Sequence, residues 1–85
     1  MKIRLEPHTL RRAKERGATE KEILETLQTG QIISAKNNRL TKSKSFSFSA
    51  EKNGKFYEEK KLEVFYTIEN DEIITITVYV FFGKF

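Results

Sequence analysis

The hydrophobic period of this chain changes from helical to alternating at Gly30, and this change constrains the fold more than any other feature. Between Pro7 and Gly30 the apolar residues follow helical spacing, as Ile23 and Leu27 do. After it apolar and polar residues alternate, most clearly over Ser45–Ala50, which is typical of half-buried strands. A run of helices followed by a run of strands predicts an α+β fold.

The first thirty residues carry start and stop signals for two short helices. Pro7 suits a first helical turn, and Gly17 can end that helix in the left-handed conformation. Thr19 and Glu22 have the spacing of a capping box, so a second helix begins there and ends at Gly30. We expect a helical hairpin.

Strand signals precede and follow this hairpin. Lys2–Glu6 alternates and predicts a short strand, and Asn53-Gly54 is a strong hairpin turn. Leu62–Ile68 and Ile73–Phe82 are rich in β-branched and aromatic residues. With 85 residues there is room for one domain, residues 1–85. The predicted architecture is therefore a helical hairpin packed on one face of an antiparallel β-sheet.

Strand parity separates a face that the helices cover from a polar face. In the last strand the covered side is expected to hold Ile74, Ile76, Val78, Val80 and Phe82. The polar face is expected to hold Ser45, Ser47, Ser49, Thr67, Thr75, Thr77 and Tyr79, with Lys61 and Glu63 nearby. Hydroxyls beside aromatics and lysines suit a groove for a nucleotide. The alternative is an ordinary solvated sheet face.

Positive charge is concentrated in the first half of the chain. Residues 1–45 carry eleven Lys/Arg against five Glu, and residues 36–44 hold four cations and no acid. Such a field attracts polyanions, so we expect Arg39, Lys42 and Lys44 to bind RNA from a basic loop. The alternative is a loop that its lysines merely keep solvated.

Several classes of protein do not fit the composition. The chain has no Cys and one His, so we expect no metal site of the usual kinds, and nothing in it indicates a cofactor. Its longest apolar run, Val78–Phe82, is far short of a membrane span. The N-terminus lacks a signal-peptide core, so the expected compartment is the cytoplasm.

Two segments carry residues suited to phosphodiester chemistry. His8, Arg12 and Arg16 share one face of the first helix, where a histidine could move a proton and arginines could hold phosphate. In residues 55–64 the candidates for gripping and stacking RNA are Tyr57, Lys60 and Lys61. The alternatives are a lone surface histidine with solubilising arginines, and a plain surface hairpin whose acids neutralise its lysines.

The order of these motifs resembles a family of small bacterial and archaeal proteins, a domain of unknown function grouped with the RelE/ParE-type toxin superfamily. The marks are His8 with Arg12, Arg16-Gly17 before the capped helix, and the segments Phe56–Val64 and Ile74–Tyr79. The resemblance implies a compact α+β fold with two helices on an antiparallel sheet. Some members of the superfamily cut messenger RNA on the ribosome without metal, and others poison gyrase.

The function expected from residues and resemblance together is a toxin-like RNA-binding protein, and specifically a metal-independent endoribonuclease of a toxin–antitoxin pair. Its partners would be RNA, including ribosome-bound messenger RNA, and an antitoxin protein. The catalytic candidates are His8, Arg12, Lys61 and Tyr79, and the substrate-binding candidates are Arg16, Arg39, Lys42, Lys44, Tyr57 and Lys60. One alternative is a non-catalytic module that binds nucleic acid or protein, and another is a structural protein that dimerises through a strand edge.

Overall fold

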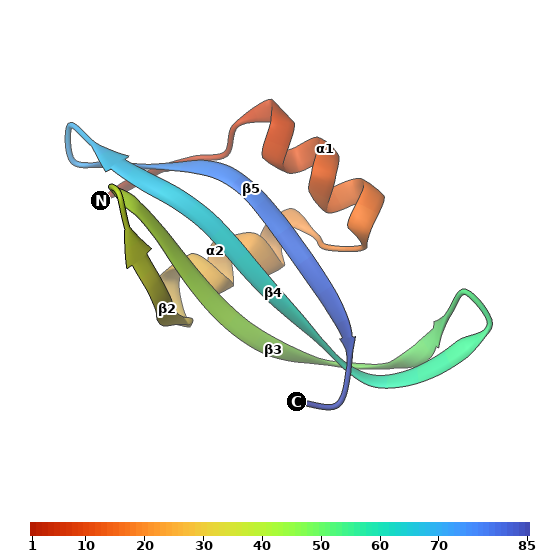
Figure 1. Ribbon diagram of the computed structural model, residues 1–85. Helices are drawn as coiled ribbons and strands as arrows, with labels where there is room; N and C mark the ends of the chain where they lie inside the picture. The colour runs from red at the N-terminus through yellow and green to blue at the C-terminus, as the bar shows by residue number, and fades with distance from the viewer.

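A computed structural model describes residues 1–85 and shows two short helices packed on a five-stranded sheet (Figure 1). The elements in chain order are β1 (Lys2–Arg4), α1 (Pro7–Arg16), α2 (Glu20–Thr29), β2 (Gln31–Lys36), β3 (Arg39–Lys52), β4 (Lys55–Glu69) and β5 (Glu72–Gly83). The strand order is β1-β5-β4-β3-β2. Figure 1 shows the β3–β4 hairpin projecting beyond the rest of the sheet. Neither helix has the length and apolar content of a membrane span.

The predicted architecture of a helical hairpin on an antiparallel sheet is wrong in two respects. The sheet is mixed, because β1 pairs with β5 in parallel. The helices pack on the sheet more than on each other, α1 against β5 and α2 against β4 and β3. Both differences depend on contacts between segments far apart in the chain, namely β1 with β5 and each helix with the strands, and the local sequence pattern does not contain them.

The local helix signals are confirmed. Pro7 opens α1, and Gly17 ends it with φ 93°. The Thr19 hydroxyl accepts from the Glu22 N–H while the Glu22 carboxylate accepts from the Thr19 N–H, which completes the capping box at α2. Asn53 and Gly54 form the β3–β4 turn with positive φ. These features depend on neighbouring residues only, so the sequence is sufficient to predict them.

The hydrophobic core lies between the helices and the central strands. Four elements meet there: the two helices supply small and branched residues, and β4 and β5 supply aliphatic residues and one tyrosine from one face. Its buried members are Ala13, Ala18, Ile23, Leu27, Leu62, Val64, Tyr66 and Val78. Burial raises the pKa of the Tyr66 phenol, because water no longer stabilises the phenolate.

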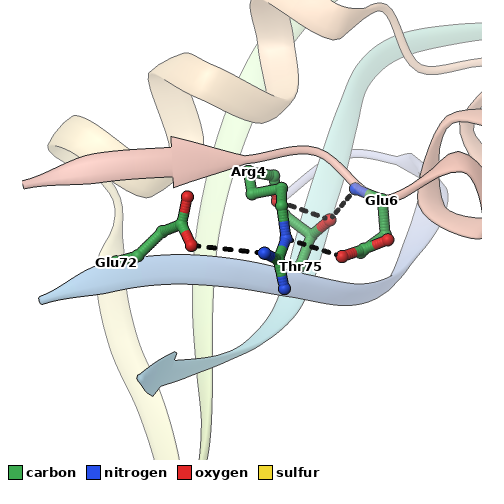
Figure 2. A network of polar contacts seen from close by, with 4 residues as sticks. All are labelled: Arg4, Glu6, Glu72 and Thr75. Carbon is green, nitrogen blue, oxygen red and sulfur yellow. Dashed lines mark hydrogen bonds and ion pairs between the residues drawn. The ribbon is translucent and has the colours of Figure 1, made fainter. Parts of the chain in front are cut away.

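A polar network joins β1 to β5 and fixes where α1 begins (Figure 2). The Thr75 hydroxyl accepts from the Glu6 N–H at 3.0 Å and donates to the Arg4 carbonyl at 3.4 Å. The Arg4 guanidinium lies 2.8 Å from the Glu6 carboxylate and 3.4 Å from the Glu72 carboxylate. One buried hydroxyl therefore holds both chain segments, which explains the inward position of Thr75.

The prediction of which side chains of the last strand face the helices is wrong for the first half of that strand. The β4–β5 register shifts between Phe65 and Tyr66, which places one extra residue, Ile76, in β5. Thr75 therefore lies on the helix-covered face opposite Tyr66, and Ile74 lies opposite Thr67 on the other face. The extra residue of a β-bulge shifts the alternation of side chains, so the residues before the bulge face the opposite way from what the alternation after it predicts.

The basic segment 36–44 is a strand hairpin and not a loop. Asn37 and Asn38 both have positive φ and join β2 to β3 in a two-residue turn. Lys42 and Lys44 consequently lie within β3. Asparagine tolerates the left-handed conformation, so the Asn-Asn pair was the sequence signal for this turn.

Candidate nucleic-acid interface

The face of the sheet opposite the helices, called here the open face, combines hydroxyl, aromatic and charged side chains. The strand register places Ser43, Glu63 and Tyr79 side by side, and places Ser45, Lys61 and Phe81 in the next row. The open face comprises Thr41, Ser43, Ser45, Lys61, Glu63, Phe65, Thr67, Ile74, Thr77, Tyr79 and Phe81. No helix covers it.

Tyr79 lies between an aromatic side chain and a cation. Its ring makes an edge contact with the Phe65 ring at 5.6 Å between centroids. The Arg16 guanidinium lies 4.6 Å from the Tyr79 ring centroid and donates to the Val78 carbonyl at 2.7 Å. The end of α1 thus brings Arg16 to the free edge of β5, where a guanidinium and a half-exposed ring meet.

A second aromatic and cationic group lies beside the first. The Lys61 Nζ is 5.4 Å from the Phe81 ring centroid and 4.8 Å from that of Phe85. Lys61 also faces the Glu63 carboxylate at 3.8 Å, too long for a strong hydrogen bond. Phe81 is 42% exposed and Phe85 51% exposed, so both rings are accessible from solvent.

Three of the predicted RNA-binding lysines lie on the helix-covered face and bind the ends of the helices. Lys42 Nζ donates to the Leu27 carbonyl at 2.7 Å. Lys44 binds the Glu25 carboxylate and the Thr29 hydroxyl, and Lys60 binds Glu22 and the Gly17 carbonyl. A cation near the C-terminal end of a helix is favourable, because the free carbonyl groups there carry partial negative charge. The last turn of α2 has no basic residue of its own, and Lys42 and Lys44 of β3 supply these cations.

The remaining candidates are distributed over several surfaces. His8 is exposed at the second position of α1, and Arg12 pairs with Glu15 at 2.8 Å. Tyr57 belongs to the projecting hairpin and packs against Phe82 at 5.8 Å. The structure therefore brings together Arg16, Lys61 and Tyr79, and these three contact neither His8 nor Tyr57 through any hydrogen bond, ion pair or ring contact.

Sequence reasoning did not select the aromatic residues that accompany Tyr79. Phe65 and Phe81 have the parity of the polar face, and this parity was the available signal. Phe85 follows the last strand, where no periodicity exists to place it. The sequence also contained a signal for the inward position of Lys42 and Lys44. They alternate in step with Phe46, which packs against the core, so they lie on the same side of β3.

Comparison with known proteins identifies the family to which this chain belongs. The chain belongs to the family described as a domain of unknown function, DUF4258, whose model matches residues 5–80. No curated protein and no solved structure matches the chain. The matched residues include both helices, all of β2 to β4, and β5 through Val80.

Proposed function

We propose that this protein binds single-stranded RNA on the open face of its sheet. The observation that carries the proposal is the contact of Arg16 with Tyr79, beside the exposed Phe81 ring and Lys61. Single-stranded nucleic acids bind where aromatic rings stack on bases and cations follow the backbone. Both elements are on one uncovered face here.

The spacing of the rings supports stacking of successive bases. Tyr79 and Phe81 are two residues apart on one strand, about 7 Å at the usual rise per residue. Lys61 lies opposite Phe81, so a phosphate beside a base stacked there would meet the lysine. Glu63 partly offsets the charge of Lys61, whereas Arg16 has no carboxylate partner.

Fluorescence anisotropy with labelled oligouridine tests the proposal. Tyr79→Ala and Phe81→Ala should each weaken binding by about fivefold to 150-fold, since loss of one stacked base costs roughly 1–3 kcal/mol. Phe56→Ala is the matched control, because Phe56 is 57% exposed but lies on the projecting hairpin. Equal affinity of all three variants and the wild type would contradict the proposal.

A second candidate is a metal-independent endoribonuclease related to the RelE/ParE-type toxins, a relation that rests on the sequence resemblance. One observation favours it: Lys61 and Tyr79 are diagonal neighbours on adjacent strands, with Arg16 beside the tyrosine. In that reaction the ribose 2′-oxygen would attack the phosphorus and lose its proton to solvent, and the bond from phosphorus to the 5′-oxygen would break. Lys61 could stabilise the negative charge on the phosphate, and the Tyr79 phenol could donate a proton to the leaving 5′-oxygen. His8, at the opposite end of α1 from Arg16, and Arg12, paired with Glu15, lie outside this group.

Cleavage assays separate the two candidates. RNA and translating ribosomes are incubated with the folded protein in EDTA. Tyr79→Phe keeps the ring and removes only the hydroxyl, so an enzyme should lose cleavage while retaining affinity. Intact RNA in both wild-type reactions would leave the binding function and remove the enzyme.

A further inference from the structure

The turn between β2 and β3 places two positive charges directly opposite each other. Lys36 and Arg39 are partners in the strand register, on either side of Asn37 and Asn38. Like charges at opposed positions of a ladder repel and destabilise it. Both side chains are exposed, and neither has an ion pair or a side-chain hydrogen bond in the structure, so no carboxylate of the fold compensates their charges.

An open hollow of about 400 Å³ adjoins this pair at one corner of the open face. Its lining combines hydroxyl, amide, cationic and aromatic groups, and it includes no acid. The lining residues are Ser34, Lys36, Asn37, Arg39, Thr41 and Phe65. Glu69 lines an adjoining hollow that Lys36 and Arg39 also line, but it forms no ion pair with either cation.

We infer that this hollow binds the terminal phosphate of an RNA chain. A terminal phosphomonoester carries nearly two negative charges, whereas an internal phosphodiester carries one. Two unpaired cations suit the terminal group, and arginine can donate two parallel hydrogen bonds to it. Bound phosphate would also remove the repulsion between Lys36 and Arg39.

The position of the hollow agrees with an anchoring role for a chain end. Phe65 contacts both the hollow and Tyr79, so a chain stacked on Tyr79 could continue directly into it. The hollow lies at the turn where β2 ends and β3 begins, so the rows that β2 and β3 contribute to the open face end beside it. The inference rests on the proposed function, since it assigns one end of the RNA bound there.

Binding of one oligouridine hexamer with three kinds of ends tests the inference. The hexamers carry a 5′-phosphate, a 3′-phosphate or hydroxyls only. One phosphorylated form should bind about tenfold more tightly than the hydroxyl form. Arg39→Gln and Lys36→Gln should each abolish that preference and leave affinity for the hydroxyl form nearly unchanged. Lys14→Gln, which removes an exposed cation from α1, should preserve it.

A stability measurement gives an independent readout. Arg39→Glu should raise the melting temperature, because it replaces the opposed cations by an ion pair, and it should abolish the phosphate preference. Equal wild-type affinity for all three hexamers would overturn the inference alone, with the proposed RNA binding intact. Failure of every hexamer to bind would overturn both.

Discussion

The Lys60 ammonium lies 2.8 Å from the Glu22 carboxylate and 2.8 Å from the Gly17 carbonyl, so one charge on β4 joins the end of α1 to the start of α2. The Lys60 side chain is only 9% exposed. The Glu22 oxygen that it binds also accepts the Thr19 N–H. A lysine at a core position of the strand is thus fully paired, as the cost of burying a charge requires.

Replacing Lys60 should destabilise the fold. Lys60→Met keeps the length of the side chain but leaves the Glu22 carboxylate partly buried without its partner. We expect a loss of about 3 kcal/mol in unfolding free energy, measured by urea denaturation. Lys55→Met, at an exposed position of the same strand, should change it by less than about 0.5 kcal/mol. Equal midpoints for Lys60→Met and the wild type would show that the pair contributes no net stability.

Gly30 should tolerate no side chain. A Cβ there would lie 2.4 Å from the Thr26 carbonyl oxygen and 2.8 Å from that of Ser43. Both atoms belong to backbone, so Gly30→Ala must separate α2 from β3 and should cost about 2–3 kcal/mol. Gly54→Ala is the comparison: nothing lies within 4 Å, and only the positive φ is unfavourable, at about 1 kcal/mol. Thermal unfolding of both variants measures the difference, and equal losses would contradict the close approach at Gly30.

Stability should decline in alkali partly because of Tyr66. Its pKa is raised by burial above the ordinary value of 10.0, so the folded state holds the proton to higher pH than the unfolded state does. The contribution is complete below pH 10.0 and is lost as pH rises through the folded-state pKa. Tyr66→Phe should therefore show a shallower decline in unfolding free energy above that pH. At pH 7 both proteins are uncharged at this position, which isolates the effect of the hydroxyl. Identical slopes would contradict the prediction.

The two faces of the sheet should respond differently to loss of a lysine. Lys61→Gln removes a cation from the open face, so the log–log salt slope of RNA binding should fall by about 0.7. Lys42→Gln removes the donor to the Leu27 carbonyl, so it should lower stability and leave the slope unchanged. Binding measured over several salt concentrations checks both. If only Lys42→Gln reduced the slope, the RNA would be bound near Lys42 on the helix-covered face and not on the open face.

The candidate site was only partly predictable for a physical reason. Tyr79 is predicted from strand parity, Arg16 from helical spacing and Lys61 from its neighbours in residues 55–64, and the structure brings the three together. Their common location depends on the strand register and on the path of α1 past the free edge of β5. Neither the register nor the path of α1 depends on residues that are neighbours in sequence. The local pattern could therefore indicate these three side chains as candidates, but it could not show that they lie together and that His8 lies elsewhere.

The sequence by itself determined the local elements: the ends of both helices, the Asn53-Gly54 turn, and the alternation that makes β3 to β5 strands. Each is decided by backbone preferences and hydrogen bonds within a few residues. Only the tertiary structure decided the parallel pairing of β1, the bulge at Ile76, and the use of Lys42, Lys44 and Lys60 as partners of helix ends. These features depend on contacts between distant segments of the chain. There, buried backbone groups must find hydrogen-bond partners and buried charges must be paired, and these requirements outweigh the local sequence pattern.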